Sequence, residues 1–175
     1  MQTTKKITRL SNGLYWLTSM LLVAIPVIVA VALWQDWLDP SHVLGRYPDL
    51  PERTQLTAAK LGLLALIGII GTLPVWVTFW NMRGLLGHYR HGDIVSADCA
   101  RHILRIGWAI LAMALWGVLG RTLQILALTH DNADGRKILA IGIEGSSLGL
   151  LLAGGLLITI GWVMGEAARE IESFI

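Results

Sequence analysis

The longest uncharged stretch of the chain is LSNGLYWLTSMLLVAIPVIVAVALWQ, residues 10–35. A helix needs about 20 mostly apolar residues to cross roughly 30 Å of hydrocarbon, and this stretch exceeds that length. Its centre therefore predicts a membrane span. Together with three later apolar stretches it predicts four spans, over residues 14–34, 61–82, 103–128 and 145–164. We expect an all-α fold, an integral membrane four-helix bundle.

Composition supports the membrane class. Apolar residues make up 54% of the sequence and charged residues 15%, whereas soluble domains average about 45–50% and 25%. The 175 residues suffice for one four-span domain, 1–175. The net charge of +2 gives no reason to expect direct nucleic-acid binding, and a single cysteine excludes an intrachain disulfide. The segments outside the spans are two outer loops (35–60 and 129–144), an inner loop (83–102) and a tail (165–175).

The distribution of lysine and arginine predicts the orientation. The N-terminal segment, the inner loop and the tail together hold eight of these cations, against five in the two outer loops. Cytoplasmic segments carry the excess of Lys and Arg, so both termini are expected in the cytoplasm. The first span is interpreted as uncleaved, because its apolar run is longer than the about 7–15 residues of a signal peptide core.

Tryptophan residues are placed consistently with this orientation. Amphipathic indole rings prefer the membrane–water interfaces. Four residues fall near the predicted inner interface, namely Trp16, Trp80, Trp108 and Trp162, with Trp76 one turn deeper. Trp34 and Trp37 fall at the outer interface.

The inner loop contains a candidate metal site. His88 lies three residues before His91, and Cys99 lies three residues before His102. Closely spaced His and Cys pairs hold structural zinc, although the more diagnostic Cys-x-x-Cys pair does not occur here. A haem held by His88 and His102 is a further alternative. Because turn and cap formation explain more of the same segment, we expect no bound cofactor.

The same loop is also interpretable as a helix connection. Gly92 and Asp93 are expected to form the turn after span two. Ser96 is expected to cap the next helix by accepting from the amide of Asp98 or Cys99, and an acidic residue at position 98 suits the helix dipole. Four cations are expected to face anionic headgroups or a partner, namely Arg83, Arg90, Arg101 and Arg105.

Two ionisable residues lie in or beside the outer half of the membrane. Arg121 interrupts span three and Glu144 precedes span four, at matching distances from the loop between them. They are candidates for an ion pair near the outer face. Two alternatives stay open: Arg121 extends outward while Glu144 lies at the interface, or both belong to a proton or ion path.

Prolines and small residues bear on helix packing. Pro26 and Pro74 each remove an intrahelical hydrogen bond, to the carbonyls of Leu22 and Ile70; we expect neighbouring helices to cover these carbonyls. The prolines are interpreted as tolerated kinks or, alternatively, as hinges. A ridge of small residues on span four permits close packing within the bundle or across a homodimer. This ridge consists of Gly145, Gly149, Ala153, Gly161 and Gly165.

A family resemblance rests on the segment HGDIVSADCARHILRIGWAIL. It resembles the inner loop and third span of a bacterial family, the domain of unknown function numbered 2975. The shared features are a Gly-polar-apolar-apolar-Ser/Thr turn at 92–96 and an Arg-Ile-Gly segment at 105–107. The C-terminal IGWVMGEAAREIESFI is similar to the family's span-four end and acidic tail. The resemblance implies a four-span membrane protein without an established activity. Some members resemble proteins whose genes lie beside genes for small helix-turn-helix regulators. This resemblance implies a membrane partner for a transcription factor.

These observations favour a non-enzymatic module of the bacterial inner membrane that binds a cytoplasmic regulator protein through its loop and tail. The alternatives are a transporter or channel subunit and a metal- or haem-binding membrane protein. The expected partners are the lipid bilayer, the regulator and, for the ridge on span four, a second copy of the chain.

Overall fold

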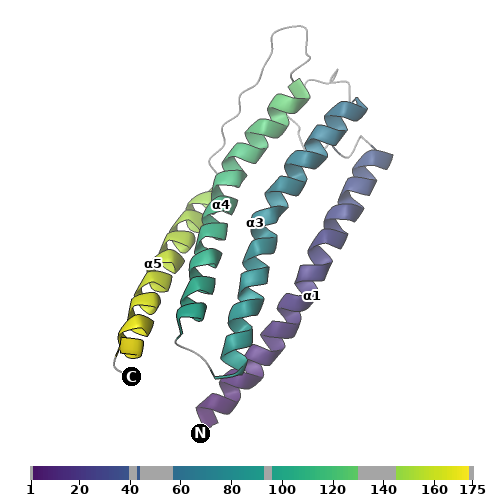
Figure 1. Ribbon diagram of the computed structural model, residues 1–175. Coiled ribbons are helices and arrows are strands. Elements are labelled where there is room, and N and C mark those ends of the chain that lie inside the picture. Colours follow the sequence, from purple (N-terminus) through teal and green to yellow (C-terminus); the bar gives the residue numbers. More distant parts are fainter. Residues whose placement is uncertain (1, 40–42, 44–56, 93–95, 130–144, 174–175) are drawn as a thin grey trace.

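Four long α-helices make up nearly all of the chain that the computed structural model describes, which is residues 2–39, 43, 57–92, 96–129 and 145–173. The helices are α1 (Gln2–Leu38), α3 (Ala58–Arg90), α4 (Ala97–Thr129) and α5 (Gly145–Ser173) (Figure 1). No strand occurs within the described ranges. Each helix contains a stretch long and apolar enough to cross a membrane. The predicted all-α, four-helix membrane fold is therefore confirmed.

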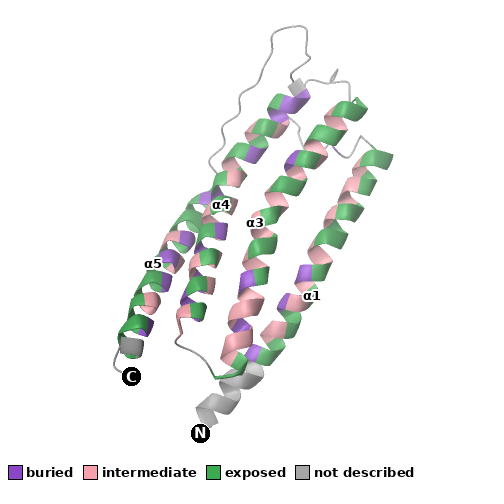
Figure 2. Cartoon of the chain, viewed as in Figure 1, coloured by how far each residue is buried: buried purple, intermediate pink, exposed green. Residues whose placement is uncertain are grey.

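The helices lie side by side in a single row, in the order of the sequence (Figure 1). Among the described residues, α1 packs only on α3, α5 packs only on α4, and the two central helices pack on each other. The bundle is therefore open, with α1 and α5 as its edges, and exposed side chains run along every helix (Figure 2). The alternating direction of the helices brings the start of α1, the α3–α4 connection and the end of α5 to one end of the molecule, named here the termini end. The opposite end is the loop end.

Most of the buried apolar side chains belong to α4, one of the two helices that have a neighbour on both sides. Many of them are small, which lets the adjacent backbones approach closely. The buried apolar residues of α4 are Cys99, Ala100, Ile103, Ala109, Ala114, Ile125, Ala127 and Leu128.

Exposed tryptophans mark a level near the termini end, named here the tryptophan belt. It contains one residue from each helix, namely Trp16, Trp80, Trp108 and Trp162, whose exposures lie between 54% and 66%. On α1 the exposed Trp34 lies about 27 Å farther along the axis. The other helices run about 26–33 Å from the belt to their loop-end termini. These lengths match the roughly 30 Å of hydrocarbon in a bilayer.

The carbonyl that Pro26 leaves without an intrahelical donor is covered from the neighbouring helix. The indole Nε1 of Trp76, on α3, donates to the Leu22 oxygen of α1 at 3.3 Å. Leu22 itself is 6% exposed, so little water can reach this acceptor. The cross-helix bond provides the partner that was expected for this carbonyl, and it is one of the ties between α1 and α3.

The α4–α5 contact is a close approach of two backbones. A Cβ built on Gly107 would lie 3.0 Å from the Gly154 oxygen, and one on Gly154 would lie 3.0 Å from the Gly107 oxygen. The residues of the predicted ridge on α5 differ in their surroundings on the two sides of this contact. Gly161 and Gly165 face α4, where added Cβ atoms would meet the side chains of Leu104 and Ala100. Gly145, Gly149 and Ala153 are exposed.

Candidate functional site at the termini end

All four helices continue past the tryptophan belt. The extension measures about 15 Å in α3, about 16 Å in α4 and α5, and about 21 Å in α1. It comprises residues 2–15, 81–90, 97–107 and 163–173, named here the termini-end extension. These residues include all eight lysines and arginines that the sequence assigns to the inner side. The extension is therefore a helical, charged structure beyond the tryptophan belt.

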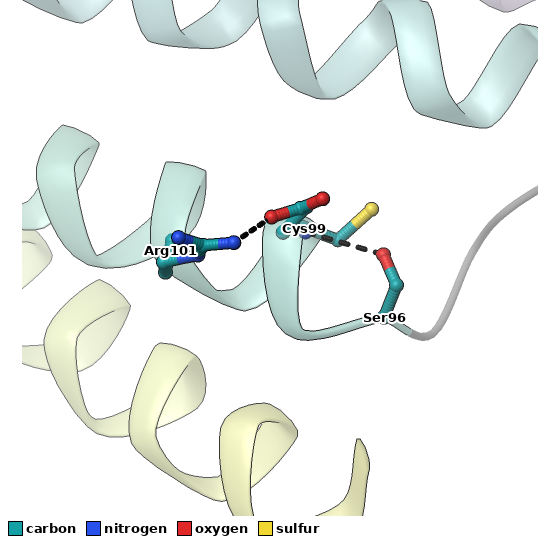
Figure 3. Close-up of polar contacts among 4 residues, drawn as sticks. Ser96, Cys99 and Arg101 are labelled. Carbon is teal, nitrogen blue, oxygen red and sulfur yellow. Dashed lines mark hydrogen bonds and ion pairs between the residues drawn. The ribbon is translucent and has the colours of Figure 1, made fainter. Parts of the chain in front are cut away.

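The connection between α3 and α4 is built from a glycine turn and a serine cap. α3 ends at Arg90. The cap residue His91 donates its amide to the His88 carbonyl, and Gly92 follows with φ +82°, a left-handed conformation that favours glycine. At the start of α4 the Cys99 amide donates to the Ser96 hydroxyl at 3.4 Å (Figure 3). Cys99 was one of the two donors expected for this cap. Asp93 lies outside the described residues.

The first turn of α4 also holds an ion pair. Asp98, close to the positive end of the helix dipole, pairs with Arg101 one turn later (Figure 3). Both side chains are more than half exposed, so the pair contributes little to stability. Its consequence is electrostatic: Arg101 already has a counter-charge within the chain.

The four candidate metal ligands do not gather in one place. The rings of His88 and His102 lie 5.8 Å apart between centroids. His91 is exposed and its Nδ1 is 2.8 Å from the Gly87 oxygen, whereas Cys99 is fully buried. No group of three His, Cys, Asp or Glu side chains with metal-site geometry occurs among the described residues. The close spacing of each pair in the sequence thus does not bring the four side chains together in the described part of the chain.

His102 instead belongs to a polar contact between α3 and α4. Its Nδ1 lies 3.1 Å from Oδ1 of Asn81, and the Asn81 amide group donates to the Val77 oxygen at 2.8 Å. Asn81 is 4% exposed. The imidazole rests against Gly84, where a Cβ would lie 2.5 Å from the ring. The sequence analysis did not predict a role for Asn81. The feature that could have indicated one is a polar amide side chain at the end of an apolar stretch.

Arg83 and Arg90 converge on Tyr15 of α1. The Arg83 Nε and Nη2 atoms donate to the Tyr15 hydroxyl at 3.2 and 3.0 Å. The guanidinium carbons of Arg83 and Arg90 lie 5.2 and 4.7 Å from the centroid of the same ring. Cation–π contacts of this length are attractive. Nothing in the spacing of the sequence identified Tyr15, because the contact joins two helices. Arg105 is exposed on α4.

The loop end has different chemistry. Lys60 donates to the Leu128 oxygen at 3.3 Å and so satisfies a carbonyl at the end of α4. A groove of about 250 Å³ beside α1 and α3 has Asp36, Thr72 and Gln124 among its otherwise apolar lining. Arg121 is exposed. Glu144 lies outside the described residues, and with it the predicted ion pair.

Comparisons with known proteins identify the family. No curated protein and no solved structure matches the chain. Residues 1–172 match the family described as protein of unknown function (DUF2975). This match covers nearly the whole sequence, and the four apolar helices agree with the multi-pass membrane architecture that the resemblance implied. The chain belongs to the DUF2975 family.

Proposed function

We propose that the protein is a non-enzymatic docking module of the bacterial cytoplasmic membrane, which binds a cytoplasmic regulator protein at its termini-end extension. The observation that carries this proposal is the length of the helices. A span alone would end at the tryptophan belt, whereas all four helices continue for about 15–21 Å beyond it. Helices of this length hold a polar surface at a fixed height above the bilayer.

The orientation is part of the proposal. The excess of lysine and arginine lies in the termini-end extension, as it does in cytoplasmic segments. On this basis the extension faces the cytoplasm.

The α4–α5 side of the extension is the surface that suits a protein. It carries charges of both signs in exposed pairs, Asp98 with Arg101 and Glu166 with Arg169. The side chains of these pairs are between 53% and 77% exposed. Alternating charges give a partner geometric and electrostatic specificity, whereas a lipid surface attracts cations alone.

The test is site-specific photocrosslinking in intact cells. A photoreactive residue replaces Arg101 or Arg169 in turn, and a third variant carries it in place of Leu152, which is 77% exposed at mid-span. We expect one soluble protein to be crosslinked at both extension positions, and only lipid at Leu152. The identity of the crosslinked protein is read by mass spectrometry.

The crosslinking result is interpreted against expression. All three variants must reach the membrane in equal amounts, measured by immunoblotting. Lipid adducts alone at all three positions would contradict the proposal. A crosslinked protein that is the same at Leu152 as at Arg101 would indicate a membrane neighbour instead of a docked soluble partner.

A further inference from the structure

Two cations of α3 contact the same side chain of α1, the phenol ring of Tyr15. The guanidinium carbons of Arg83 and Arg90 both lie within 5.2 Å of the centroid of one phenol ring. Both guanidinium groups are positive, so they repel one another. An anion in contact with both groups would reduce this repulsion.

No carboxylate supplies that anion within the described chain. Neither Arg83 nor Arg90 forms an ion pair with a described residue, in contrast to Arg101 and Arg169. The sequence contains no Asp or Glu at all in residues 1–35 or 58–92, which cover nearly all of α1 and the whole of α3.

Hydrogen-bond donors remain available at the same place. Arg83 uses Nε and Nη2 on the Tyr15 oxygen, which leaves Nη1. The Tyr15 oxygen accepts from Arg83, so its own proton is left to donate to another group. The guanidinium carbon of Arg90 lies over the ring of Tyr15, and a guanidinium carries its N–H donors in its own plane. Arginine and tyrosine donors of this kind match the oxygens of a phosphate.

The position along the helix axis indicates the source of the phosphate. Tyr15 immediately precedes Trp16, and Arg83 lies one turn beyond Trp80, both of which belong to the tryptophan belt. Headgroup phosphates of phospholipids occupy this level of a bilayer, beside the aromatic belt. Trp16 and Trp80 are 64% and 54% exposed, so an acyl chain can pass along both helices below the cations.

We infer that Tyr15, Arg83 and Arg90 form a binding site for the phosphate of an anionic phospholipid, between α1 and α3. The site is independent of the partner proposed for the α4–α5 side. The lipid supplies the negative charge that the two helices lack. It also fastens α1, which among the described residues packs only on α3, to the rest of the row.

The test compares lipids and variants in zwitterionic detergent micelles. Phosphatidylglycerol, phosphatidylcholine and inorganic phosphate are titrated into the purified protein, and affinity is obtained from the rise in the thermal unfolding midpoint. We expect stabilisation by phosphatidylglycerol and none by phosphatidylcholine. Each arginine near an anionic surface is worth about 1 kcal/mol, so Arg90→Gln should bind about fivefold more weakly and the Arg83→Gln/Arg90→Gln variant about 30-fold.

Two variants separate this site from general electrostatics. Arg101→Gln removes an equal charge from a cation that already has a counter-ion and should keep the wild-type affinity. Tyr15→Phe keeps the ring that both guanidiniums contact and loses only the hydroxyl, so it should weaken binding while the protein stays folded. Stabilisation by inorganic phosphate that is lost in Arg90→Gln would support the same site with a soluble anion as its ligand. Equal lipid affinity in wild type, Arg90→Gln and Arg101→Gln would overturn the inference.

Discussion

The bond between Trp76 and the Leu22 carbonyl gives a sharp prediction about how a proline is tolerated in α1. Trp76→Phe removes the indole N–H and keeps an aromatic ring. The Leu22 oxygen would then lose its donor, because Pro26 has no N–H to offer it. We expect the variant to lower the free energy of unfolding.

The size of the effect follows from the geometry. The 3.3 Å separation is longer than the usual 2.9–3.0 Å of an N–H···O bond. Side-chain hydrogen bonds between membrane helices average about 0.6 kcal/mol, with a maximum of about 1.7. A buried carbonyl left without a partner costs about 1–3 kcal/mol. Because the bond is long and Trp76 is 39% exposed, we expect a loss of about 1 kcal/mol from the hydrogen bond.

A double-mutant cycle isolates this term from lost packing. In Pro26→Ala the new amide at position 26 can donate to the Leu22 oxygen, so the indole becomes redundant. Trp76→Phe should therefore cost about 1 kcal/mol less in the Pro26→Ala background than in wild type. Unfolding is measured by titrating SDS into detergent micelles and following far-ultraviolet circular dichroism.

Trp80→Phe is the matched control, because Trp80 stacks on Trp76 with centroids 5.4 Å apart and does not contact Leu22 through a hydrogen bond. It should cost the same in both backgrounds. If Trp76→Phe were also equally costly in both, within about 0.3 kcal/mol, the reasoning about the proline carbonyl would be refuted.

Three further predictions concern packing. Gly71→Ala should destabilise the protein by about 1–3 kcal/mol, because the added Cβ would lie 2.2 Å from the indole nitrogen of Trp116 on α4. Gly68→Ala should leave stability unchanged, because its Cβ has nothing within 4 Å, and SDS unfolding distinguishes the two variants. By the same assay Gly107→Ala should lower the free energy of unfolding, since its Cβ would clash with backbone atoms of α5. Gly149→Ala should leave the free energy of unfolding unchanged, because its Cβ has nothing within 4 Å. Equal effects of the two variants would contradict the α4–α5 contact. Cys99 is 0% exposed, so a maleimide should label it slowly in the folded protein and rapidly in SDS, and equal rates would show that the start of α4 is open.

The fold could be predicted because each span is a local property of the sequence. Twenty or more apolar residues must form a helix in lipid, where every backbone group needs an internal partner, and the turn at Gly92 and the cap at Ser96 are also local. The arrangement of the helices could not be predicted in this way. Every span is apolar on all sides, so the pattern does not indicate which face contacts a neighbour or that the row stays open.

The site residues illustrate the same division. The candidate metal site was defined by spacing along the chain, yet His91 and Cys99 belong to the end of one helix and the first turn of the next, and they face in different directions. Asn81 and Tyr15 matter through partners on other helices, His102 and Arg83, that lie 21 and 68 positions away. Contacts of this kind depend on the packing of the helices, so the spacing of residues along the chain does not reveal the partners.

The termini end of α3 joins the two halves of the row. Asn81, Gly84 and His88 recur at the three- and four-residue steps of one helical stripe, which faces His102 on α4. Arg83 and Arg90 lie two turns apart on a second stripe, which faces α1. Because α1 packs on no other helix among the described residues, its position depends on this second stripe and on the Trp76 bond. Within the described residues, α3 is thus the helix that connects α1 to a partner docked on α4 and α5. The lipid phosphate inferred at Arg83 and Arg90 would act on that same connection.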